Sequence, residues 1–166
     1  GLKIHGSNLC TEIFLPTSEK RTAVCCLSSL NLEYFDHWNT NEQFIPDVME
    51  FLDNVLQYFI DNAPNSVERA RYSALRERSI GIGALGFHAY LQSKRIPIES
   101  VLAKSINYRM FSHIKEECAR GDEILCEKRG PCPDAKDAGI PRRFSHWNAV
   151  APVSYTHLRA HETSLH

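Results

Sequence analysis

Three side chains near the start of the sequence could do chemistry together. Asn8, Cys10 and Glu12 stand two residues apart in the stretch GSNLCTEI. In an extended segment side chains alternate between two faces, so we expect these three to project to the same side. A thiol can give up a hydrogen atom, a carboxylate can act as a general base, and an amide can hold a hydroxyl group. The set therefore suits radical or redox chemistry in a buried pocket.

A second thiol lies close by in the sequence. Cys25 belongs to an apolar segment at 22–30, which a polar turn at 17–21 joins to the first segment. Folded back, the two segments would share one pocket, and Cys25 could supply reducing electrons by thiol–disulfide exchange. The alternative is a half-buried strand with a packed cysteine, because free cysteine is among the most buried residue types. A cysteine nucleophile would need a base. The only local candidate is His5, which would project from the opposite face of an extended segment to Cys10.

The remaining chemical groups form no recognisable site. The six cysteines include no CxxC pair and no cysteine–histidine spacing typical of zinc, so we expect reduced thiols and no metal site. Gly81, Gly83 and Gly86 match G-x-G-x-x-G, but a dinucleotide site would need a hydrophobic strand directly before it. The preceding segment is polar and charged. We expect these glycines to let a helix over 80–93 pack closely against a neighbour.

Composition indicates one globular domain. The 166 residues are 43% hydrophobic and 23% charged with a net charge of −1, which gives no indication of a nucleic-acid or membrane partner. The chain begins at Gly1 without an initiator Met, so we expect part of a longer protein. Residues 153–166 read like a translated sequencing adapter, and we expect them to be a non-native read-through tail; a natural surface tail is the alternative.

Helices should dominate the rest of the chain. Apolar residues recur at helical spacing over 47–63, including Phe51 and Val55, and predict a core-facing helix. Further helices are predicted at 66–76, at 80–93 and, as one or two elements, at 99–128. Residues 4–13 are expected to form a strand–loop–strand, 22–30 a buried strand or the start of a helix, and 130–143 a loop.

Several stretches, in the right order, resemble the large (catalytic) subunit of ribonucleotide reductase of the class I type. They are NLCTEI at 8–13, AVC and LSSLNL within 23–32, RSIGIGALGF at 78–87 and AVAP at 149–152. The resemblance covers residues 1–152 and implies an α/β fold: part of a ten-stranded α/β barrel, mainly helical in this portion, with the radical cysteine on a loop inside. Residues 1–152 would thus be a partial catalytic barrel domain.

The resemblance also implies a role for each candidate residue. Cys10 would be the thiyl radical that takes the 3′ hydrogen of the ribose, and Glu12 would accept the 3′-hydroxyl proton. Asn8 would hydrogen-bond the ribose hydroxyls, with Ser7 as a further substrate contact. Cys25 would be one of two reducing thiols that end each turnover as a disulfide. Cys26 is the second candidate for that role, because a shift of one position would exchange the two.

By the same resemblance, the chain would hold no cofactor of its own. A metal-containing small subunit would supply the radical, ATP and deoxynucleotide effectors would bind regions that this sequence lacks, and thioredoxin or glutaredoxin would reduce the disulfide. The large subunit would form a homodimer in the cytoplasm, away from membranes. The second reducing cysteine, the allosteric sites and the C-terminal shuttle cysteines of the family are absent, so we expect the chain by itself to be inactive.

Other classes stay open at this point. An adenosylcobalamin-dependent ribonucleotide reductase shares the Asn-Cys-Glu arrangement. A non-enzymatic helical interaction module would use the cysteines only for packing, and a cysteine hydrolase would need an activated thiol.

Overall fold

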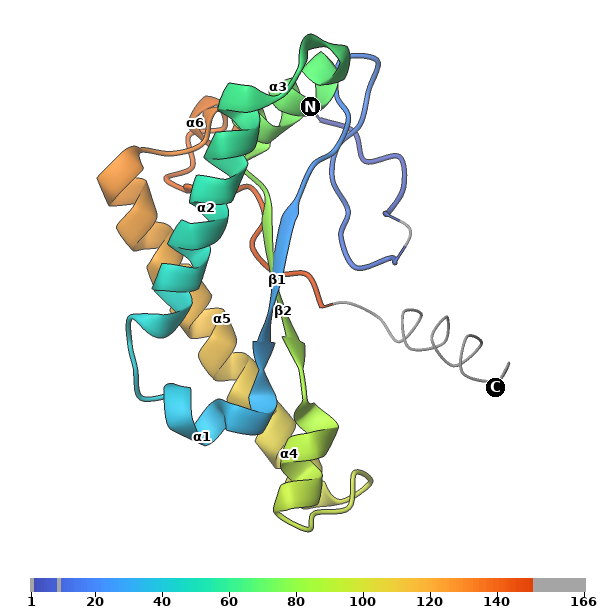
Figure 1. Cartoon of the computed structure of the whole chain (residues 1–166), viewed down its shortest axis with the longest axis vertical. Helices are drawn as coiled ribbons and strands as arrows, with labels where there is room; N and C mark the ends of the chain where they lie inside the picture. Colours follow the sequence, from blue (N-terminus) through green and yellow to red (C-terminus); the bar gives the residue numbers. More distant parts are fainter. Residues whose placement is uncertain (1, 9, 151–166) are drawn as a thin grey trace.

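The computed structural model describes residues 2–8 and 10–150, so the expected read-through tail at 153–166 lies outside the described residues. Within them, helices pack against a two-stranded parallel sheet (Figure 1). This arrangement confirms the predicted α/β class and the predominance of helix in this portion. None of the described helices is long and apolar enough to cross a membrane.

The sheet brings together segments that lie far apart in the sequence. Strand β1 (Cys26–Asn31) pairs in parallel with β2 (Ile80–Leu85), and Cys26 lies opposite Ile80. On the other edge of β2, the amide nitrogen of Ile82 donates to the carbonyl oxygen of Trp147 at 2.7 Å. The strand β2 is therefore central, which explains why its first four residues are buried.

Helices connect the strands and continue beyond them. They are α1 (Phe35–Trp38), α2 (Phe44–Asn62), α3 (Glu68–Glu77), α4 (Phe87–Ser93), α5 (Val101–Arg129) and α6 (Pro133–Asp137), with 3₁₀ turns at Leu32–Tyr34 and Asn65–Val67. Because parallel strands need a crossover connection, α2 and α3 carry the chain from the end of β1 back to the start of β2. The helices predicted at 47–63, 66–76 and 99–128 are confirmed, the last as one helix.

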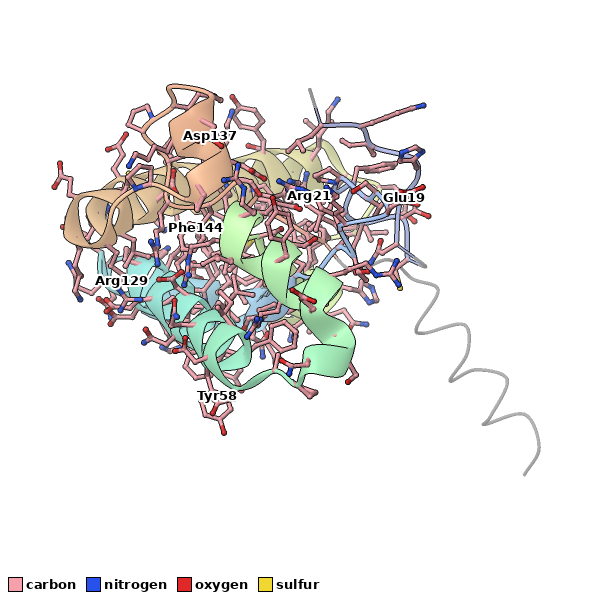
Figure 2. The ribbon with its side chains drawn as sticks, turned by 90° about the horizontal axis from the view of Figure 1, so that it is seen from above. Glu19, Arg21, Tyr58, Arg129, Asp137 and Phe144 are labelled. Carbon is pink, nitrogen blue, oxygen red and sulfur yellow. The ribbon has the colours of Figure 1, made fainter. Side chains whose placement is uncertain are left out.

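The core lies between α2, α5 and the sheet. Met49 of α2 and Met110 of α5 are fully buried there, and the fully buried Phe144, after α6 in the chain, completes the centre. Leu56 of α2 is also fully buried, in a smaller cluster with Ile60 and Ala74. The two helices approach closely at Gly121, where a Cβ atom would lie 2.7 Å from the sulfur of Met49. Figure 2 shows Phe144 inside the molecule and Tyr58 pointing away from it.

The predicted apolar stripe of α2 was partly wrong. Phe51 and Val55 are exposed, because the buried face follows the line of Met49, Leu52 and Leu56. The expected loop at 130–143 also contains the short helix α6.

The helix predicted over 80–93 was wrong in its first half. Residues 80–85 form β2, and α4 starts only after Gly86. Gly86 has a left-handed backbone with a φ of +79°, which turns the chain between the strand and the helix. A Cβ atom at Gly83 would lie 2.6 Å from the carbonyl oxygen of Ala149, and one at Gly81 would lie 2.3 Å from the side chain of Leu27. The predicted close packing of these glycines is thus real, but it serves a strand between two neighbours.

Candidate active site

The three candidate residues at the start of the chain lie in a turn. The strand–loop–strand expected over 4–13 was wrong: the amide nitrogen of Thr11 donates to the carbonyl oxygen of Asn8 at 3.1 Å, and Thr11 has a φ of +58°. The side-chain oxygen of Asn8 also accepts from the amide nitrogen of Glu12 at 3.2 Å. Asparagine favours such local bonds over a ladder, which explains the turn. The expected alternation of Asn8, Cys10 and Glu12 on one strand face is therefore also wrong.

The turn nevertheless joins two of these side chains directly. The amide nitrogen Nδ2 of Asn8 donates to Oε1 of Glu12 at 2.7 Å. The other carboxylate oxygen, Oε2, is buried and has no hydrogen-bond partner among the described residues. An unpaired buried carboxylate oxygen is costly, so this atom keeps an acceptor site that a hydrogen-bond donor could satisfy.

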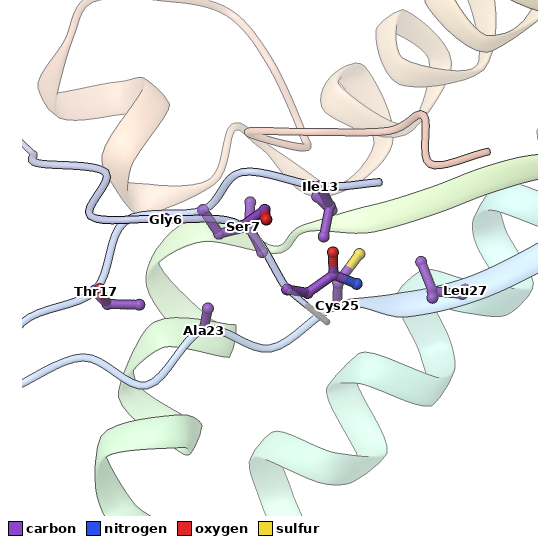
Figure 3. A pocket seen from close by; sticks show the side chains of 9 residues that line it. Gly6, Ser7, Ile13, Thr17, Ala23, Cys25 and Leu27 are labelled. Atoms are coloured by element: carbon purple, nitrogen blue, oxygen red, sulfur yellow. The ribbon is translucent and has the colours of Figure 1, made fainter. Parts of the chain in front are cut away.

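A cavity of about 340 Å³ lies between this turn and the start of β1. Figure 3 shows Cys25 facing the segment that carries Ser7 and Ile13. The lining residues are Gly6, Ser7, Asn8, Ile13, Leu15, Thr17, Ala23, Cys25 and Leu27. The structure thus brings together three of the predicted site residues at the cavity: Ser7, Asn8 and Cys25. Glu12 does not line the cavity and is connected to it through its hydrogen bond with Asn8. The predicted polar turn at 17–21 is present and returns the chain, with Ser18 and Arg21 exchanging backbone hydrogen bonds of 3.1 Å.

The predicted radical cysteine lies beside this cavity in sequence but does not line it. Cys10 is partly buried in the turn between Asn8 and Glu12, and it is not among the lining residues in the described part of the chain. The structure therefore places Cys10 between two residues that bond to each other, while Cys25 faces the cavity from the opposite wall.

The Cys25 thiol is held neutral. Burial raises its pKa to about 11, and the neighbouring Cys26, Glu12 and Glu77 act in the same direction, whereas a hydrogen bond from Ser79 opposes them. A neutral thiol suits hydrogen or electron transfer and argues against a hydrolase nucleophile, which would need an activated thiolate. Both adjacent cysteines pack against core residues, Cys25 against the small cluster of Ile13, Leu15 and Ala149 and Cys26 against the two other clusters. Only Cys25 of the two lines the cavity.

A buried ion cluster anchors the wall that leads to Cys25. Nη1 of Arg21 lies 2.6 Å from Oδ2 of Asp134 and 3.2 Å from Oε1 of Glu77. Figure 2 shows Arg21 inside the molecule and Glu19, just before it in the chain, at the surface. Sequence reasoning did not find this cluster, because its members lie in three separate segments and share no motif.

A second buried cluster holds the end of α3. Asp53 of α2 is fully buried and accepts hydrogen bonds from Arg78 at 2.8 Å, from Arg129 at 2.6 Å and from Arg143 at 3.0 Å. Burial alone would raise the pKa of Asp53, but the hydrogen bond from Arg143 and the charges of Arg78 and Arg143 hold it below its ordinary value. The cluster ties α2, α5 and the C-terminal segment to the point where β2 begins.

The chain is similar in sequence to a known protein family. The family model described as the ribonucleotide reductase barrel domain matches residues 1–164. The chain is 56% identical to the ribonucleoside-diphosphate reductase large subunit of Invertebrate iridescent virus 3, over 99% of this chain and 26% of that protein. It is 49% identical to the large subunit of Invertebrate iridescent virus 6, over 93% of this chain and 16% of that protein.

A solved structure shows the same fold. The class Id ribonucleotide reductase alpha subunit of Actinobacillus ureae matches with a TM-score of 0.84 and 37% identity, over 92% of this chain and 29% of that chain. The chain therefore spans about a quarter or less of the length of the first two curated relatives.

Proposed function

Because this chain belongs to the ribonucleotide reductase barrel-domain family, we propose that it supplies the radical-bearing part of an enzyme that reduces ribonucleoside diphosphates to deoxyribonucleotides. The observation that supports this most strongly is the bond between Asn8 and Glu12 next to a cavity that Cys25 lines. An amide, a carboxylate with a free oxygen and a reducing thiol are the groups that a ribose reduction requires.

The proposal assigns a role in ribose reduction to each candidate residue. Cys10, as a thiyl radical, takes the hydrogen atom from C3′ of the ribose, and the free Oε2 of Glu12 accepts the proton of the 3′-hydroxyl. Asn8 keeps the Glu12 carboxylate in place and, with Ser7, contacts the ribose hydroxyls. Cys25 is one of the two reducing thiols.

The atoms and electrons balance over one turnover. The 2′ carbon–oxygen bond breaks and the hydroxyl leaves as water, taking up a proton. Two thiols supply the electron pair and the protons, and they end as a disulfide. Cys10, which became a thiol on taking the C3′ hydrogen, returns that hydrogen atom to C3′ and is again a thiyl radical. Glu12 returns its proton to the 3′ oxygen. One of the two reducing thiols is Cys25, and we assign the other to a part of the protein outside this chain.

The partners follow from the same assignment. The relatives are named large subunits and the solved neighbour an alpha subunit, which supports a second, small subunit that carries a metal and generates the radical. We further propose thioredoxin or glutaredoxin as external reductant, a homodimer of the large subunit, and ATP and deoxynucleotide effectors bound outside this chain. A cytoplasmic location fits thiols that must be re-reduced after each turnover.

A reductase of the adenosylcobalamin-dependent class is the second candidate function, because it would use the same turn. The solved neighbour is a class Id alpha subunit and the relatives are diphosphate reductase large subunits, which favours the two-subunit class. Dependence of turnover on added adenosylcobalamin, with no small subunit present, would favour the second candidate.

The test replaces Cys10 by serine in the complete large subunit, assayed with its small subunit and a dithiol. We expect Cys10→Ser to abolish deoxynucleotide formation without lowering the melting temperature, because serine keeps the turn but cannot carry the radical. Cys126→Ser is the matched control, since Cys126 is also partly exposed and lies far along the chain on α5. Full turnover by Cys10→Ser would refute the proposed role.

A further inference from the structure

A buried hydroxyl group outside the predicted motif contacts the Cys25 sulfur. Oγ of Ser79 lies 3.5 Å from Sγ of Cys25 and donates to it, and the Ser79 residue is fully buried. On its other side, Cys25 Sγ lies 3.8 Å from the carbonyl oxygen of Cys26 and donates to it as a thiol. The sulfur is therefore held between one donor and one acceptor.

These two contacts respond oppositely when the sulfur becomes negative. The carbonyl oxygen of Cys26 presents lone pairs to the thiolate and repels it. The Ser79 hydroxyl keeps its proton and forms a stronger, charge-assisted bond. Among the described side chains, Ser79 is the one whose hydrogen bond lowers the pKa of Cys25 against burial.

The fold holds Ser79 in place from behind. Helix α3 ends at Glu77, and the C-cap residue Arg78 has a left-handed backbone with a φ of 45°. Its guanidinium group donates to Asp53 Oδ1 at 2.8 Å and to Gln57 Oε1 at 2.8 Å. A left-handed arginine is unfavourable, and such strain persists only where the surroundings fix it. On the other side of Ser79 in the chain, Ile80 pairs with Cys26 in the sheet. The backbone of Ser79 is therefore fixed by both neighbouring residues.

We propose that Ser79 is a positioning residue for the reducing thiol, directing the Cys25 sulfur toward the cavity and stabilising the thiolate that leaves when its disulfide is opened. In that step an external dithiol attacks the partner sulfur, the sulfur–sulfur bond breaks, and the electron pair stays on Cys25 until solvent supplies a proton. The inference deepens the proposed function, because it assumes that Cys25 is a reducing thiol.

The test compares Ser79→Thr with Ser79→Val, which have nearly the same shape but differ in the hydroxyl group. The rate of Cys25 alkylation by iodoacetamide is measured at pH 8 on this chain, with fragment-ion mapping to separate Cys25 from Cys26. Losing one hydrogen bond to a charged group raises a thiol pKa by about one unit, and higher nucleophilicity offsets part of the loss of thiolate. We therefore expect alkylation of the valine variant to be about threefold slower than that of the threonine variant.

The sign of the effect separates this role from a merely structural one. Loosening the packing would expose the sulfur and speed its alkylation, whereas loss of the donor slows it. Ser73→Ala is the matched control, because Ser73 is also fully buried on α3 and its hydroxyl has no partner among the described residues. This control should leave the Cys25 rate unchanged, and the melting temperatures of all variants verify folding.

An equal or faster rate for Ser79→Val than for Ser79→Thr would overturn the inference. That outcome differs from a failure of the proposed function. If alkylation slows as expected but Cys25→Ser leaves turnover of the complete enzyme intact, the contact is real and the assignment of Cys25 as reductant is wrong.

Discussion

Asn8 and Glu12 hold each other by two reciprocal hydrogen bonds, one between their side chains at 2.7 Å and one from the Glu12 backbone to the Asn8 side chain at 3.2 Å. The first fixes the carboxylate and the second fixes the turn around Cys10. A single asparagine thus sets both the direction of the proposed base and the path of the backbone that carries the proposed radical residue. The other carboxylate oxygen of Glu12, Oε2, has no hydrogen-bond partner among the described residues.

Asn8→Ala should impair turnover more than folding. It removes a charge-assisted hydrogen bond at a partly open site, so kcat/KM of the complete enzyme should fall about tenfold to a hundredfold. Steady-state kinetics and the melting temperature are the two measurements. Asn62→Ala is the control, because Asn62 donates an amide hydrogen bond at 2.8 Å at the far end of α2. Equal kinetics for both variants would show that Asn8 does not position Glu12.

Gly83→Ala should destabilise the contact between β2 and the C-terminal segment. Its Cβ would lie 2.6 Å from the backbone carbonyl oxygen of Ala149, which cannot move without breaking the bridge between Ile82 and Asn148. Overpacking of this kind costs about 1–3 kcal/mol of unfolding free energy, measurable by urea denaturation. Gly6→Ala is the control, because nothing lies within 4 Å of its Cβ position. A loss of the same size for Gly6→Ala would contradict this account.

Asp53→Asn should lower the unfolding free energy strongly. Asp53 is fully buried and faces Arg78, Arg129 and Arg143, so its loss leaves uncompensated positive charge, at a cost of about 3–5 kcal/mol. Asp61 is exposed and accepts one surface hydrogen bond from Gln57, which the oxygen of an asparagine can also accept, so Asp61→Asn should stay within about 0.5 kcal/mol of the parent. A mild effect at Asp53 would mean that Glu50, the other carboxylate near Arg129, carries the cluster.

Glu77→Gln should change how stability depends on pH. Burial raises the pKa of Glu77 from 4.5 to about 7, although Arg21 lies 3.2 Å away and acts against the shift. The folded state therefore binds this proton more tightly than the unfolded state. The stability that Glu77 contributes is full below pH 4.5 and is lost as the pH rises to about 7.

The measurement compares urea unfolding of the parent and of Glu77→Gln from pH 4.5 to 8. The parent should lose about 3 kcal/mol relative to the variant across this window. The carboxyl groups of Asp53 and Asp134 do not interfere, because their pKa values are lowered and they titrate below the window. Parallel stability curves for the two proteins would contradict the raised pKa.

Elements with a strong period were predictable from the sequence. The stripe over 47–63 and the long run at 99–128 produced α2 and α5 with small errors at their ends. The prediction of a helix over 80–93 was wrong in its first half because Gly81 and Gly83 have no side chains, so the sequence does not show the two-residue hydrophobic period of a strand. Both positions require glycine because Ala149 approaches them too closely for a Cβ atom, and Ala149 lies more than sixty positions further along the chain.

The sequence singled out candidate residues for the site, whose roles stay predictions, but it did not predict their geometry. Residue chemistry and resemblance singled out Asn8, Glu12 and Cys25, and the cavity and the Asn8–Glu12 bond now connect them. The strand alternation used to group the first two was wrong, because a left-handed Thr11 is invisible in the sequence. Ser79 was missed because its contact with Cys25 depends on the pairing of β1 with β2.

The most direct test of the account follows the Cys25 thiol through a single turnover. The complete protein, with its C-terminal shuttle cysteines replaced by serine so that they cannot re-reduce Cys25, is given its small subunit and a ribonucleoside diphosphate but no external dithiol. It is then quenched, alkylated and mapped by mass spectrometry. We predict that deoxynucleotide formed and Cys25 lost to a disulfide rise together in equal amounts, while Cys26 stays free to react. Deoxynucleotide formation with the Cys25 thiol still fully alkylatable would contradict the central claim that this cavity is where the ribose is reduced.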